Sequence, residues 1–180
     1  ALADKGMALV ATDGNPIDMV WQDRPSPPTA PIALHPVELA GRTAAEKLDL
    51  VQTELAKAGH DATVLAAPDS IAWLLNIRGG DLPHTPFPLS FAIVPKAGKP
   101  MLYIDPAKIG GNVGGVLKDI AIVEVPDALM QGLGALGTAK AKVRLDHEVT
   151  AVWFKTALES AGAEIIKGTD PCLLPKARKT

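Results

Sequence analysis

Residues 43–75, TAAEKLDLVQTELAKAGHDATVLAAPDSIAWLL, predict a helix, a buried strand and a second helix in succession. Thr43 and Glu46 have the spacing of a capping box, in which the hydroxyl and the carboxylate satisfy free amides at a helix start. Apolar residues then recur at helical spacing until Gly59, a residue type that favours a helix end. Residues 62–66 form a short, mainly apolar run that is typical of a buried strand.

The chain that follows continues this alternation of helices and strands. Strands expected at 91–94 and 101–104 flank the turn-prone residues 97–100, which predicts a hairpin. Further helices are expected at 113–120, at 128–136 and from Asp146 through Ser160, and further strands at 122–125, 143–145 and 165–166. The pattern predicts an α/β fold whose mixed sheet of parallel and antiparallel strands is flanked by helices.

The segment before residue 43 has a different composition. Residues 7–11 predict a short buried strand, and residues 17–21 have the spacing of one or two helical turns. Five prolines then fall within residues 23–36. Because proline fixes φ and removes a donor, we expect an extended, stiff connector and a domain boundary there.

Composition excludes several classes of function. The 18 basic and 20 acidic residues give a net charge of −2, so no nucleic-acid partner is expected. Cys172 is the single cysteine, which excludes an internal disulfide and a Cys-rich zinc site. No run approaches the roughly 18 apolar residues of a membrane span, so no membrane partner is expected either. The start lacks a methionine and a signal-like pattern, which indicates a piece of a longer chain.

Common catalytic signatures are missing from the sequence, including G-x-S-x-G, H-E-x-x-H and the P-loop. The glycine-rich residues 110–115 are expected to form a flexible turn. Residues 146–148, Asp-His-Glu, are consecutive and point in different directions, so they are not expected to share one metal ion. Trp153 and Phe154 are expected in the core.

The loop at residues 78–88, RGGDLPHTPFP, is the best candidate for a binding edge. It places Arg78, Asp81 and His84 among glycines and prolines, and proline-rich loops can present polar groups rigidly. The alternative is a structural loop with an internal Arg78–Asp81 ion pair and His84 as an ordinary surface residue. The residues alone leave both interpretations open.

The block at residues 69–86, DSIAWLLNIRGGDLPHTP, resembles the Xaa-Pro aminopeptidase pattern D-x-I-A-W-L-x-N-[IL]-R-G-x-D-[VI]-x-H-[NT]-P. Gly80 stands where that family more often has serine. The segments 15–21, NPIDMVW, and 35–41, HPVELAG, are similar to the family's connector, with Leu39 where tyrosine is usual. Residues 170–179, DPCLLPKARK, are similar to the segment that precedes the family's catalytic domain.

The resemblance implies a three-domain parent, with two creatinase/prolidase-type N-terminal domains before a peptidase domain. Residues 1–21 would then be the tail of the first domain, 22–41 the Pro-rich connector, 42–176 the second domain and 177–180 the start of a link to the catalytic domain. Two divalent metals, usually manganese, would be held in that missing domain. The parent would remove an N-terminal residue that precedes proline, using metal-activated water.

For this chain the resemblance implies no catalytic residue, no bound metal and no cofactor. It makes Arg78, Asp81 and His84 the candidates for a substrate entrance, because the corresponding loop in relatives lies near a catalytic cleft. The expected partners are the chain's own catalytic domain, a peptide with proline in second position and a second copy in a homodimer, in the cytoplasm. The alternatives are a binding module of the same fold without catalysis and a creatinase-type amidine hydrolase. The Pro-rich connector argues against the hydrolase.

Overall fold

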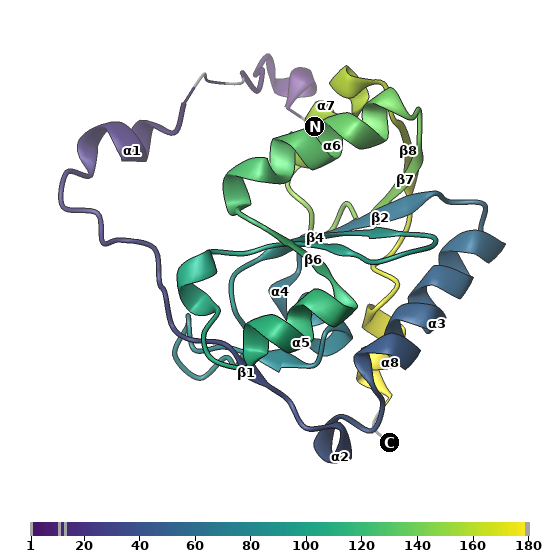
Figure 1. Ribbon diagram of the computed structural model, residues 1–180. Helices are drawn as coiled ribbons and strands as arrows, with labels where there is room; N and C mark the ends of the chain where they lie inside the picture. Colours follow the sequence, from purple (N-terminus) through teal and green to yellow (C-terminus); the bar gives the residue numbers. More distant parts are fainter. Residues whose placement is uncertain (1, 11, 13, 179–180) are drawn as a thin grey trace.

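A six-stranded mixed sheet forms the centre of the computed structural model, which describes residues 2–10, 12 and 14–178 (Figure 1). The strand order is β6-β5-β4-β2-β7-β8. Their bounds are β2 Ala62–Leu65, β4 Phe91–Pro95, β5 Met101–Tyr103, β6 Ile122–Glu124, β7 Lys142–Leu145 and β8 Glu164–Lys167. Strand β4 pairs antiparallel with β2 and β5, whereas β5–β6, β2–β7 and β7–β8 are parallel. The predicted mixed α/β sheet and its hairpin are confirmed.

Helices cover both faces of this sheet (Figure 1). On one face lie α6 (Leu129–Thr138) and α7 (Val152–Ala161). On the other lie α3 (Ala44–Lys57), α4 (Pro68–Leu74), α5 (Val113–Ile120) and α8 (Leu173–Ala177). Because side chains alternate along a strand, β4 contributes Ala92 and Val94 to one core and Ile93 to the other. The sheet therefore separates two apolar layers.

The close contact of α6 with α7 depends on glycine. A Cβ atom on Gly137 would lie 2.3 Å from the Cβ of Ala161, a distance that real side chains do not reach. The predicted capping box of α3 is confirmed, since Thr43 Oγ1 accepts from Glu46 N and Glu46 Oε2 accepts from Thr43 N. That network also lowers the pKa of Glu46, mainly through the backbone hydrogen bond.

The prediction that Asp146 caps the next helix was wrong. Helix α7 begins at Val152, and Asp146 instead accepts from the amides of Glu148 at 3.0 Å and Asp170 at 2.8 Å. The aspartate therefore stabilises a turn, a use to which its short side chain is well suited. Sequence periodicity could not distinguish these two local hydrogen-bonding patterns.

Three smaller expectations also need correction. Residues 7–10 are exposed and form no strand, while residue 11 lies outside the described residues. Trp153 is 47% exposed and packs edge-on against Phe154, which alone of the two is buried. Gly114 and Gly115 belong to α5 and not to a turn, because only residues 110–112 precede the helix.

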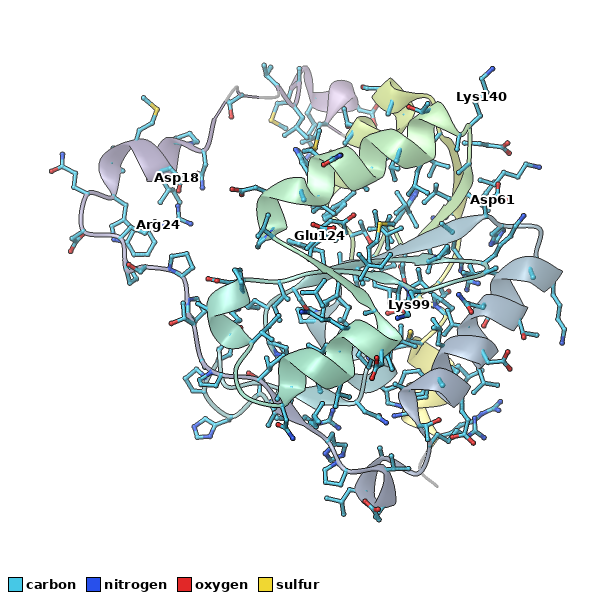
Figure 2. The ribbon with its side chains drawn as sticks, in the orientation of Figure 1. Asp18, Arg24, Asp61, Lys99, Glu124 and Lys140 are labelled. Carbon is cyan, nitrogen blue, oxygen red and sulfur yellow. The ribbon has the colours of Figure 1, made fainter. Side chains whose placement is uncertain are left out.

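The N-terminal segment runs along the outside of the molecule before it joins the core (Figure 1). Its helix α1 (Pro16–Val20) is exposed, and the Asp18–Arg24 ion pair lies on this arm (Figure 2). Ile32 is buried, and β1 (Ala33–Leu34) forms a small sheet with β3 (Ile77–Arg78). The remaining short elements are α2 Val37–Ala40 and the 3-10 turns Ala3–Lys5, Pro106–Lys108 and Pro126–Ala128.

The helices in the described part of the chain are too short or too polar to cross a bilayer.

Candidate functional site

The candidate loop, residues 78–88, begins at the end of β3, in the small sheet that β3 forms with β1. Strand β3 is held by antiparallel pairing with β1, with Ala33 opposite Arg78. The loop then folds back, and Gly79 N donates to Pro86 O at 3.3 Å. A Cβ atom on Gly79 would lie 2.8 Å from Pro88 N, so the loop base requires glycine.

Asp81 anchors this loop from inside. Its Oδ2 accepts from Leu89 N at 2.6 Å and from Lys108 Nζ at 2.6 Å. The side chains of Asp81 and Lys108 are 0% and 5% exposed, and Lys108 also donates to Leu89 O at 3.2 Å. A buried ion pair with additional hydrogen bonds fixes geometry, and losing one partner strands a buried charge. Asp81 therefore holds the loop against the 3-10 turn that carries Lys108.

The predicted alternative of an Arg78–Asp81 ion pair was wrong, because Asp81 pairs with Lys108. The sequence signal for the true partner was weak. Lys108 lies 27 positions away, in a turn whose orientation depends on the β4–β5 hairpin. Its burial follows from tertiary packing alone.

His84 lies at the exposed tip of the loop. Its φ is +62°, in the left-handed region that few residues other than glycine adopt. The tip is a tight turn, with Thr85 N donating to Leu82 O at 3.3 Å and Thr85 Oγ1 donating to the same oxygen at 3.2 Å. The imidazole is thus presented outward by a backbone that Asp81 anchors from below.

Arg78 belongs to a different group of side chains. It is half-buried, and its Nη1 donates to Ile77 O at 2.8 Å and to Ala72 O at 3.4 Å. Burial lowers the pKa of Arg78. The pKa of His35 is lowered by burial and by the charges of Arg78 and Lys47. The guanidinium of Arg78 therefore bonds to main-chain carbonyls and Asp81 pairs with Lys108, so these two residues do not form the expected pair.

Lys47 was missed as a functional candidate by sequence reasoning. It is only 2% exposed, and its Nζ donates to Trp73 O at 3.0 Å and to Asn76 Oδ1 at 2.5 Å. The ammonium also lies 4.8 Å from the centre of the Trp73 ring. Burial, and then the charges of Arg78 and Arg42, lower the pKa of Lys47 to about 8. A lysine at a core-facing position of α3 was the only sequence signal.

Asn76 makes this arrangement possible. Its φ of +51° is left-handed, a conformation that asparagine tolerates better than most residues. The backbone carbonyl of Asn76 accepts from His35 N at 2.7 Å, and its Nδ2 donates to Arg42 O at 2.8 Å. One side chain thereby connects the start of α3 to the end of α4 and supplies an oxygen to Lys47.

The residues present do not fit a catalytic metal. Within the described ranges, no three His, Cys, Asp or Glu side chains lie close enough together to bind an ion. Both carboxylate oxygens of Asp146 already accept backbone amides. Cys172 is fully buried, and burial raises the pKa of its thiol, so it is not an activated nucleophile.

The sheet and its two helical layers define an α/β domain, and the buried Asp81–Lys108 pair anchors the candidate loop to it. An X-prolyl aminopeptidase from Caenorhabditis elegans, described as a cytosolic enzyme with a di-nuclear active site, matches with a TM-score of 0.86 and 26% identity. The match covers 99% of this chain and 30% of that one. The Streptococcus thermophilus aminopeptidase P matches in fold, with a TM-score of 0.54, 13% identity and coverage of 74% and 98%.

The Creatinase/Prolidase N-terminal domain family model matches residues 23–180, and the chain belongs to that family. Aminopeptidase P2 of Arabidopsis thaliana is 34% identical over 149 residues, which are 82% of this chain and 21% of the relative. A probable Xaa-Pro aminopeptidase P of Arthroderma benhamiae is 37% identical over 142 residues, 78% of this chain and 20% of the relative. The chain thus spans about a fifth of the length of these relatives.

Proposed function

We propose that this chain is a non-catalytic domain of a larger Xaa-Pro aminopeptidase, and that it has no peptidase activity alone. Two observations together support the proposal. Most of the chain is similar to Xaa-Pro aminopeptidases, and the described residues contain no group of side chains that could hold a metal ion. The parent would remove an N-terminal residue that precedes proline. Two divalent metals, of which manganese is the expected ion, would be held by a different domain.

Within that parent, the loop of residues 78–88 would line the substrate entrance. His84 would contact the peptide, because it is exposed at the tip. Asp81 would position the tip through its buried pair with Lys108. Arg78 would support the loop base through its bonds to main-chain carbonyls. A cytoplasmic location belongs to the same proposal and is supported by the relative described as cytosolic. The homodimer stays a prediction.

The test uses the full-length parent with His84→Ala, and His147→Ala as the matched control on another exposed histidine. Loss of one substrate hydrogen bond is worth about 0.5–1.5 kcal/mol, or about 2- to 13-fold in kcat/KM for an X-Pro peptide. We expect that loss for His84→Ala, with an unchanged melting temperature and no effect of the control. A fall in stability with unchanged activity of the folded fraction would contradict the entrance role.

The parent's activity is tested separately from the role of the loop. The 180-residue chain and the full-length parent are each assayed with manganese and an X-Pro peptide. We expect turnover by the parent and none by the chain. A parent without turnover under these conditions would favour the alternative of a binding module without catalysis, since fold alone does not decide function.

A further inference from the structure

A small pocket lies on the side of the molecule formed by α3 and α8. It is lined by the end of α2, the first half of α3, the end of α4 and the end of α8. Its volume is about 210 Å³. Three cationic side chains line it, Arg42, Lys47 and Arg178. Trp73, Leu50 and Pro175 supply apolar walls. The pocket therefore combines positive charge with a flat aromatic surface.

None of the three cations forms an ion pair in the part of the chain that the structure describes, although the charge of Arg42 contributes to the lowered pKa of Glu46. The ion pairs there involve other residues, and the hydrogen bonds of Lys47 go to the neutral oxygens of Trp73 and Asn76. Arg42 and Arg178 are exposed, and their guanidinium groups form no hydrogen bond with the described residues. Five donors on each guanidinium are therefore available to a ligand.

Burying an ammonium without a counter-charge is unfavourable, because desolvation is not offset by a nearby negative charge. The surroundings of Lys47 add to this cost, since Arg42 and Arg78 both disfavour its charged form. His35 experiences the same positive field. An anion in the pocket would offset the cost, and the guanidinium groups could bind its oxygens in a bidentate manner.

The geometry points to an anion-binding site in this pocket, with Lys47 as the buried anchor, Arg42 and Arg178 as the rim, and a small oxyanion as ligand. The ligand carries a carboxylate or phosphate group, because those groups match the fork of a guanidinium. The pocket volume suits a small molecule or one side-chain-sized group. No residue of the loop that carries His84 lines this pocket, and the proposed site does not depend on the peptidase parent.

Binding is measured on the 180-residue chain by calorimetry and NMR, with acetate, citrate and inorganic phosphate as probes at low ionic strength. We expect saturable binding of at least one probe. Citrate binding without phosphate binding would assign carboxylates, and the reverse would assign phosphates. Side-chain NMR should also show the pKa of Lys47 rising from about 8 on binding, because a nearby anion favours the ammonium.

Two sets of variants decide whether the pocket is the site. Lys47→Met should weaken binding at least about 10-fold, and the double variant Arg42→Gln/Arg178→Gln should do so by a similar factor. The arginine variant changes only exposed side chains, so it keeps the test valid if Lys47→Met fails to fold. Arg24→Gln, on the distant arm, is the matched control and should bind normally (Figure 2).

Titrations that do not saturate with any probe would overturn the proposal. The same conclusion would follow if the folded arginine variant bound as tightly as the wild type, or if Arg24→Gln weakened binding equally. Each of these results would mean that the pocket is not an anion site. The hydrogen bonds of Lys47 to Trp73 and Asn76 would then have a structural role only.

Discussion

Lys108 and Lys47 are both almost fully buried, with 4% and 2% of their surface exposed, but only Lys108 has a carboxylate partner. Lys108 pairs with Asp81 and fixes the candidate entrance loop to the β4–β5 hairpin region. Lys47 has two neutral oxygens and the face of Trp73. Burial is therefore a poor guide to the role of a lysine, because the partner decides whether the charge is neutralised.

The difference between the two lysines indicates different roles for the regions around them. The charges of Asp81 and Lys108 are paired with each other inside the protein, whereas His84 is exposed at the loop tip. Lys47 has no carboxylate partner, and its pKa is lowered because burial and the nearby arginines disfavour its charged form. A negative charge bound beside Lys47 would therefore stabilise the ammonium. Four predictions test this comparison, from the largest expected effect to the smallest.

Asp81→Asn should destabilise the protein by about 3 kcal/mol, because it leaves the Lys108 ammonium buried without a counter-charge. Urea unfolding measures the change. Arg24→Gln is the control, since it breaks the exposed Asp18–Arg24 pair and should cost less than about 1 kcal/mol. Equal costs for the two variants would show that the buried pair is no more important than a surface pair.

Lys47 should make the protein more stable as the pH rises from about 8 to about 10.5. Its folded-state pKa is lowered to about 8, so over this range the folded form has lost a proton that the unfolded chain still binds. Burial raises the pKa values of Tyr103 and Cys172, and these groups oppose the trend at alkaline pH. The wild type must therefore be compared with Lys47→Met.

The difference in unfolding free energy between these two proteins should grow by about 2 kcal/mol across that range in favour of the wild type. Urea unfolding of both proteins at several pH values gives this difference directly. If this difference in unfolding free energy did not change with pH, Lys47 would have its ordinary pKa in the folded protein. The proposed electrostatic difference between Lys47 and Lys108 would then be wrong.

Asn76→Asp should supply Lys47 with the carboxylate that it lacks. We expect the pKa of Lys47 to rise from about 8 by at least about one unit, which side-chain NMR can follow. The variant also replaces the amide that donates to Arg42 O, so the readout is the pKa and not stability. Asn112→Asp, at the start of α5, adds the same charge elsewhere and should leave the pKa of Lys47 unchanged.

His84→Gly should change stability by less than about 0.5 kcal/mol, because the side chain is exposed. Glycine adopts the φ of +62° without strain, which offsets its larger entropy loss on folding. Thermal unfolding provides the measurement. A loss comparable to that of Asp81→Asn would show that the tip itself, and not only its anchor, holds the loop.

Much of the architecture could be predicted from local pattern. The capping box at Thr43, the β4–β5 hairpin and the alternating elements were visible because each depends on residues close in sequence. The start of α7 was missed because Asp146 could either cap a helix or close a turn. Trp153 was misplaced because helical spacing does not show which of two adjacent aromatics faces the core.

The sequence by itself determined the α/β class and the loop that carries Arg78, Asp81 and His84, since both depend on local periodicity and composition. Only the tertiary structure decided the partners of these residues. It paired Asp81 with Lys108 across 27 positions and brought Arg78 toward His35 and Lys47. The physical reason is that charge pairing depends on distance in space, and the sheet brings together side chains from turns and helices that are far apart along the chain.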